Sequence, residues 1–134
     1  MVDADPIVQA FNDVNQRRKR WAIVKVDTSS NYTLEATGER DDGIEQCKAA
    51  LPNNEPRYVL FDFEAQKEDG SKLNKTVFVA YSPDDCTSMP MKFALMNYAA
   101  AVKAKASYSV EKQINDINDF NENEFRGYFN LPPL

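Results

Sequence analysis

The chain has 134 residues, of which 43% are hydrophobic and 28% are charged. This length and composition predict one globular domain rather than a disordered segment. A formal net charge of −5 argues against general nucleic-acid binding, and the absence of histidine removes the commonest general base and metal ligand. No apolar run approaches the roughly 20 residues that span a bilayer, and the N-terminus is acidic where a signal peptide would be basic, so we expect an intracellular protein that does not span a membrane.

Motifs of catalysis or cofactor binding are missing from the sequence. There is no Gly-rich phosphate loop, CxxC pair, GxSxG elbow or HExxH motif. Carboxylates gather at residues 41–42, 84–85 and 116–124, where helix starts are expected, so capping explains them better than acid–base catalysis. Cys47 and Cys86 are widely spaced, and we expect free thiols. We therefore expect no enzyme, no cofactor and no metal site.

The first predicted element is a helix over residues 5–16. Asp5 offers an N-cap acceptor and Pro6 suits the first helical position. Apolar residues then recur at helical spacing, at Ile7, Ala10, Phe11 and Val14. The basic connector 17–20 follows. It is interpreted as a solvated turn ahead of a strand, and the alternative is a weak nuclear-import or lipid-headgroup patch.

Stretches rich in β-branched and aromatic residues predict the strands. They cover residues 21–26, 32–36, 57–64, 75–82 and a short stretch within 108–114. The stretch 57–64, RYVLFDFE, has too few polar residues for an edge, so it predicts a central strand that is buried on both faces. Turn residues at 27–31 and 67–72 predict two hairpins.

Three further helices are predicted. One opens at residues 41–42 and ends at Pro52, a long one lies within residues 82–105, and a last one is capped by Asn118 or Asp119. On the long helix, a core-facing stripe is formed by Leu95, Tyr98, Val102 and Ala106. A neighbouring face carries Lys92, Met96, Ala99 and Lys103. Periodicity alone allows this second face to be either solvated or in contact with a large partner.

The order of elements predicts the fold class. Helix, hairpin, helix, hairpin, long helix, short strand and helix together indicate an α+β protein, with a mixed sheet of five to six strands and helices on both faces. The sequence shows no repeat, low-complexity segment or internal boundary, so residues 1–134 are expected to form a single domain.

Three stretches resemble the actin-depolymerising factor homology domain of the ADF/cofilin family. Residues 10–13, AFND, with the basic connector and the aromatic strand after them, resemble the first helix and strand of the family. Residues 51–64, LPNNEPRYVLFDFE, resemble its core segment. Residues 75–84, KTVFVAYSPD, resemble its Ser-Pro-Asp segment, with Tyr81 where tryptophan is common. The resemblance implies a cytoplasmic, monomeric protein that binds monomeric actin and filament sides, and promotes filament disassembly without a cofactor.

The resemblance also implies a site for monomeric actin on the long helix, which in the family enters the cleft between two actin subdomains. One register places residues 96–100 on the family motif. The register that we prefer places residues 92–95 there, since it needs only a one-residue insertion and keeps residues 102–103 aligned. With the N-terminal residues beside the helix, the implied site comprises Met1, Val2, Asp3, Lys92, Phe93, Met96, Asn97 and Lys103.

A second family site contacts the neighbouring subunit of a filament through basic residues. The matching residues are Lys72 and Lys75 on the hairpin and Arg126 on the last helix. This helix departs from the family because it lacks an acid–base pair and contains Gly127, so weak severing is expected.

Regulation and the alternatives also follow from the resemblance. The first residues lack the serine whose phosphorylation blocks actin binding in many members. Phosphoinositide inhibition would use Lys92, Lys103 and Lys105. The alternative function keeps the fold and changes the partner: a glia maturation factor-like protein acting on the branch-nucleating complex, or a coactosin-like filament binder.

Overall fold

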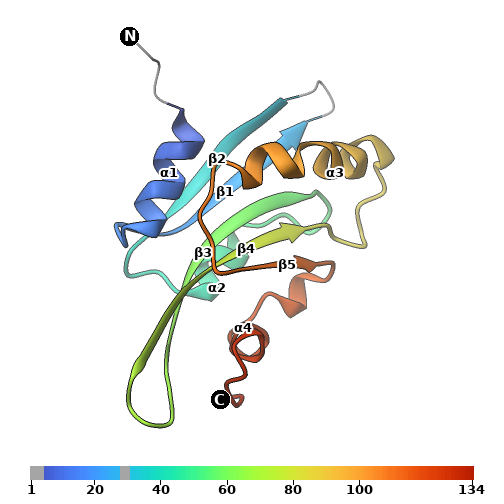
Figure 1. Cartoon of the computed structure of the whole chain (residues 1–134). Helices are drawn as coiled ribbons and strands as arrows, with labels where there is room; N and C mark the ends of the chain where they lie inside the picture. The colour runs from blue at the N-terminus through green and yellow to red at the C-terminus, as the bar shows by residue number, and fades with distance from the viewer. Residues whose placement is uncertain (1–4, 28–30) are drawn as a thin grey trace.

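A computed structural model describes residues 5–27 and 31–134 as a five-stranded mixed sheet with helices on both faces (Figure 1). The strands are β1 (Lys19–Asp27), β2 (Asn31–Glu39), β3 (Arg57–Gln66), β4 (Lys72–Tyr81) and β5 (Val110–Ile114). The helices are α1 (Pro6–Asn15), α2 (Ile44–Ala49), α3 (Met89–Lys103) and α4 (Glu122–Tyr128), with a short 3₁₀ helix at Ile117–Asp119. The predicted fold class is confirmed.

The strand order is β2-β1-β3-β4-β5, which places β3 in the middle. All neighbouring pairs are antiparallel except β4 and β5, which run parallel and are joined through α3. Every residue from 57 to 63 is buried, so the predicted central, two-sidedly buried strand is confirmed. Successive side chains of β3 point to opposite faces, and therefore contribute alternately to two cores.

Each face of the sheet has its own hydrophobic core. On one face, α1 and α3 pack Phe11, Leu95 and Val102 over the sheet residues Tyr58 and Phe78. On the other face, the side chains that α2 and α4 contribute include Cys47 and Phe125. Figure 1 shows α1 and α3 on the near side of the sheet, with α2 behind it.

The start of α1 follows the prediction. The Asp5 carboxylate accepts a hydrogen bond from the Ile7 amide at 2.9 Å, and Pro6 occupies the first turn. The end of α1 is less ordinary. Arg17 has a φ of 62°, while the amide of Arg18 donates to the Asp13 carbonyl at 2.8 Å and the amide of Arg17 donates to the Val14 carbonyl at 3.1 Å. These are the two bonds of a Schellman motif, whose left-handed position usually holds glycine.

Three helices begin later than the sequence predicts. Asp42 accepts from the Glu39 amide at 3.0 Å, which completes a turn, and α2 begins only after Gly43. Asp84 and Asp85 likewise lie in a turn, and α3 is capped by Ser88 instead. The predicted caps at residues 118–119 were wrong for α4, because they fall in the 3₁₀ helix and Asn121 caps α4.

The strands extend beyond their predicted ends, and this changes the interpretation of the basic connector. β1 begins at Lys19, so only the first half of residues 17–20 is a turn. The guanidinium of Arg20 donates to the carbonyls of Asp62 at 3.2 Å and of Arg40 at 3.0 Å, and so joins the sheet to the segment after β2. Similarly, Lys72 belongs to β4 rather than to the hairpin turn.

Both cysteines are free, as expected, and both side chains are buried. Burial raises the pKa of the Cys47 thiol well above its usual value, so this side chain is a neutral part of the α2 core at physiological pH.

Candidate functional site

Helix α3 carries an exposed apolar stripe on its outward side. Met89 and Phe93 are each 54% exposed and Met96 is 70% exposed. Their spacing of four and then three residues puts them on one side of the helix. Within residues 5–27 and 31–134, the only other large hydrophobic side chain that is exposed is Leu134. Such a concentrated apolar stripe is typical of a surface that contacts a partner.

The inner side of α3 explains why this stripe cannot turn inward. Ala94, Leu95 and Val102 are buried in the core, and Tyr98 packs against it. Most of the predicted core-facing stripe is therefore confirmed, although Ala106 lies beyond the end of the helix.

A groove runs between α3 and the β4–β5 edge of the sheet, with a volume of about 630 Å³. The predicted second face, Lys92, Met96, Ala99 and Lys103, lines one wall, above an apolar floor that includes Phe78 and Leu95. Lys103 forms an ion pair with Glu111 of β5 at 3.1 Å. The face that periodicity singled out therefore borders a groove.

The predicted monomer-site residues on α3 occupy two adjoining surfaces. Phe93 lies on the exposed stripe, Lys92 and Lys103 lie at the groove, and Met96 belongs to both. Asn97 is exposed. The other predicted members, Met1, Val2 and Asp3, lie outside the described residues. Met89 was not among the predicted residues, although its distance of four residues from Phe93 indicated that both side chains lie on one side of the helix.

Several contacts fix α3 against the sheet. The hydroxyl of Tyr58 on β3 donates to the carbonyl of Leu95 in the middle of the helix, and burial raises the pKa of Tyr58. Lys105, just after the helix, donates to the Asp5 carboxylate at 2.5 Å and thereby links it to the start of α1. The outward stripe is thus presented on a firmly anchored helix, which limits the entropy lost when a partner binds.

The β3–β4 hairpin extends beyond the rest of the sheet (Figure 1). Its turn contains Gly70 at a φ of 88°, a conformation that glycine adopts without strain. Lys72 and Lys75 are both exposed. Because they are three residues apart on a strand, they point to opposite faces of the hairpin. The two predicted filament-site lysines therefore present two surfaces.

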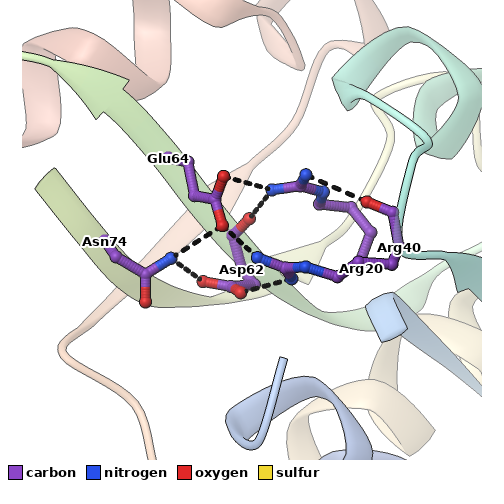
Figure 2. A network of polar contacts seen from close by, with 5 residues as sticks. All are labelled: Arg20, Arg40, Asp62, Glu64 and Asn74. Atoms are coloured by element: carbon purple, nitrogen blue, oxygen red, sulfur yellow. Dashed lines mark hydrogen bonds and ion pairs between the residues drawn. The ribbon is translucent and has the colours of Figure 1, made fainter. Parts of the chain in front are cut away.

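A polar network joins the hairpin to β1 and to the segment after β2 (Figure 2). The buried Asp62 carboxylate accepts from Arg40 at 2.6 Å and from the Asn74 amide at 2.8 Å. Glu64 is held by ion pairs to Arg40 and to Arg20, the latter at 3.5 Å, and by the Asn74 amide at 3.2 Å. These bonds hold the part of the hairpin between Lys72 and Lys75 in place.

The third predicted filament residue, Arg126, is only 9% exposed. Its Nε donates to the carbonyl of Pro132 at 2.6 Å, so the side chain holds the segment that follows α4. The amide of Leu131 donates to the carbonyl of Arg126 at 2.9 Å and the amide of Asn130 to that of Gly127 at 3.2 Å, which is the pattern of a Schellman motif. Arg126 consequently offers little surface to a partner in this conformation.

Other kinds of site find no support in the part of the chain that the structure describes. There, no group of three or more histidine, cysteine or acidic residues could hold a metal ion. No helix within the described ranges has the length and hydropathy to cross a membrane.

Comparison with known proteins gives consistent results. The chain matches the family model for the cofilin/tropomyosin-type actin-binding protein over residues 1–130. It is 31% identical over 124 residues to actophorin from Acanthamoeba castellanii, covering 89% of this chain and 87% of that protein. The fold is shared with a cofilin from Streptomyces griseoflavus, at a TM-score of 0.84 and 20% identity over 95% of both chains. It is also shared with coactosin from Entamoeba histolytica, at a TM-score of 0.74 and 19% identity over 93% of this chain and 89% of that one.

Proposed function

This chain belongs to the ADF/cofilin family of actin-binding proteins, and we propose that it binds monomeric actin through α3 and filament sides through the β3–β4 hairpin. By binding actin through both sites, the protein would promote filament disassembly and turnover. It would act as a monomer, without catalysis or a cofactor, in the cytoplasm at the actin cytoskeleton. Entry into the nucleus is also proposed.

The observation that carries the monomer site is the exposed apolar stripe on α3. Phe93 and Met96 project from a fixed helix, and flexible, polarizable methionine suits an irregular cleft on a partner. Lys92 and Lys103 lie at the adjoining groove, where cations would steer an acidic partner and fix its orientation more than they add affinity. The proposed site comprises Met1, Val2, Asp3, Lys92, Phe93, Met96, Asn97 and Lys103, extended by Met89.

Substitutions on α3 test this site through the affinity for monomeric actin. Phe93→Ala removes a large exposed ring without touching the core, and it is expected to weaken binding about tenfold or more, as for an interface anchor. Lys92→Ala is expected to weaken binding less, with the loss concentrated in the association rate at low salt. Lys48→Ala on α2, which packs on the opposite face of the sheet, is the control. Unchanged affinity in Phe93→Ala and Lys92→Ala alike would rule out the α3 site.

For the filament site we propose Lys72, Lys75 and Arg126, with most of the contact from the two lysines. Lys72→Glu and Lys75→Glu are each expected to reduce co-sedimentation with filaments and to leave monomer affinity unchanged, because the hairpin is separate from the α3 stripe. Equal losses for monomer and filament would contradict a two-site arrangement. The enclosure of Arg126 supports weak severing, since one predicted cation is engaged within the protein.

The same enclosure favours a second candidate function. A glia maturation factor-like or coactosin-like protein would act on branched or filamentous actin without a strong monomer site. The fold alone does not distinguish these functions. Binding to monomeric actin does, because the second candidate predicts filament or branch binding that survives Phe93→Ala.

Phosphoinositide inhibition is proposed to use Lys92, Lys103 and Lys105. Two of these lysines already have partners, since Lys103 pairs with Glu111 and Lys105 with Asp5. A lipid headgroup would have to compete with both carboxylates. Inhibition of monomer binding by phosphoinositide-containing vesicles, compared with vesicles of neutral lipid, tests this part.

A further inference from the structure

A small cleft lies where the end of α1 meets the β3–β4 hairpin. It has a volume of about 250 Å³ and is lined by Arg17, Glu64, Ala65, Lys72 and Asn74. Arg17 comes from the basic connector, which had been interpreted as a solvated turn. The structure therefore brings a cation of the connector to the same cleft as one of the two hairpin lysines.

The two cations of this cleft have no counterion among the residues that the structure describes. Three of the four basic connector residues form ion pairs: Arg18 with Asp13 at 3.0 Å, Lys19 with Glu39 at 3.3 Å, and Arg20 with Glu64 at 3.5 Å. Across the described residues, neither Arg17 nor Lys72 is ion-paired or hydrogen-bonded through its side chain.

The carboxylate in the cleft does not supply the missing counterion. Glu64 is held by ion pairs from Arg40 and Arg20 and accepts from the Asn74 amide (Figure 2). The charge of Glu64 is therefore compensated by the two arginines of the polar network. Arg17 and Lys72 leave an excess of positive charge at the opening of the cleft, which would attract the carboxylate of a partner.

The backbone at Arg17 gives no local reason for an arginine. With a φ of 62° at the left-handed position of a Schellman motif, glycine would be the least strained residue. The motif does fix the direction in which the side chain leaves the end of α1. The guanidinium also presents a rigid fork of donors that suits bidentate binding of a carboxylate.

We infer that Arg17 and Lys72 together bind an acidic segment of the neighbouring actin subunit in a filament. Lys75 points to the other face of the hairpin and makes a separate contact. This inference rests on the proposed filament-side binding and adds a residue and a partner chemistry to it. Arg17 then contacts the filament directly, and the connector is part of the interface.

The test is co-sedimentation with filaments at low salt, using Arg17→Gly, Arg17→Lys and the control Arg18→Ala. Arg17→Gly removes the guanidinium but suits the left-handed backbone, so it should fold at least as stably as the wild type. We expect it to weaken filament binding about two- to fivefold, in the range of an exposed ion pair, with the difference shrinking at high salt. Arg17→Lys should retain most of the affinity, and Arg18→Ala should match the wild type. Monomer affinity should be the same for all four proteins.

A double substitution tests whether the two cations share one carboxylate. If they do, the losses of binding free energy from Arg17→Gly and Lys72→Ala will be less than additive. The first substitution already weakens the hold on the shared carboxylate, so the second removes less binding energy than it would alone. Additive losses would overturn the shared-carboxylate inference. Wild-type affinity in Arg17→Gly would overturn the role of Arg17 while leaving the proposed function intact. A wild-type protein that does not bind filaments would overturn both.

Discussion

Gly38 and Trp21 make the tightest glycine contact in the described chain. A Cβ built on Gly38 of β2 would lie 2.3 Å from atoms of the Trp21 indole on β1. Trp21 is buried, and its indole nitrogen has no hydrogen-bond partner among the described residues. The ring is therefore held by packing alone, directly against the backbone of its neighbouring strand.

Replacing Gly38 by alanine is expected to lower the free energy of unfolding by about 1–3 kcal/mol, the usual cost of overpacking a core. Gly127→Ala is the matched control. No atom lies within 4 Å of a Cβ at Gly127, and glycine weakens helix α4, so this change should raise the free energy of unfolding by about 0.5–1 kcal/mol. Urea denaturation followed by circular dichroism measures both. Similar effects of the two substitutions would show that the indole shifts aside easily.

The roles of individual residues were only partly predictable from the sequence. Helical spacing predicts that Lys92 and Met96 share one face of α3, and both side chains line the groove beside this helix. The enclosure of Arg126 was not predictable. It depends on where the chain turns after α4, and this is set by Asn130 at a φ of 60° and by the Pro132 carbonyl, neither of which a spacing pattern encodes.

Among the elements, α1 depends on a single side chain for two contacts. One oxygen of Asp5 caps the helix, and the other accepts from Lys105 at the far end of α3. The hydrogen bond from Lys105 is the main cause that lowers the pKa of Asp5 below its ordinary 3.8. Asp5 thus connects the start of one helix to the end of another on the same face of the sheet.

Two substitutions of Asp5 separate these contacts. Asp5→Asn keeps a good cap but removes the ion pair, and it should cost a few tenths of a kcal/mol, as for exposed pairs. Asp5→Ala removes both and should cost about 1 kcal/mol. Because the folded-state pKa is lowered, the ionic contribution is complete above the unfolded value and disappears as the pH falls through the folded value. Thermal denaturation at neutral and acidic pH checks this. A difference between wild type and Asp5→Asn that persists in acid would contradict it.

The caps show which features of the elements a sequence reveals. Asp5 followed by proline is an isolated signal, and it was predicted correctly. Residues 115–124 contain eight Asn, Asp or Glu side chains, and several of them could cap a helix equally well. The choice of Asn121 depends on Phe120 and Phe125 both reaching the core, which is a tertiary constraint.

On the scale of the whole molecule, tyrosines whose pKa is raised by burial or partial burial make folding sensitive to alkaline pH. Tyr81 is buried on β4 and donates to the carbonyl of Pro52 at 2.8 Å, and burial raises its pKa to about 12. Burial likewise raises the pKa of Tyr128 to about 12. In the unfolded chain both would ionise near pH 10.

Stability should therefore be lost between about pH 10 and pH 12. Below the unfolded pKa both states hold the proton and the contribution is complete, whereas above it the unfolded state is favoured by ionisation. Denaturant midpoints measured across this window should fall, and tyrosinate absorbance should appear together with the loss of circular dichroism. Tyr81→Phe should make the fall shallower. Ionisation of all tyrosines near pH 10 without unfolding would contradict the prediction.

The sheet was the most predictable part of the whole molecule. RYVLFDFE is apolar on both sides, and only a central strand accommodates that pattern. The groove beside α3 was not predictable from the sequence. Its size depends on the distance between α3 and the parallel strand β5, which no local sequence pattern encodes. The meeting of Arg17 with Lys72 at one cleft was missed for a similar reason, since these two residues are 55 positions apart in the sequence.

The alternation of side chains along β3 also bears on how freely this molecule could change. Val59, Phe61 and Phe63 serve the core under α2 and α4, whereas Tyr58 and Leu60 serve the core under α1 and α3. The proposed monomer-binding helix rests on only one of these two layers. The sheet thus separates the two cores. Substitutions in the α2–α4 core, whether evolved or engineered, could therefore repack that core while the proposed actin-binding surface of α3 keeps its shape.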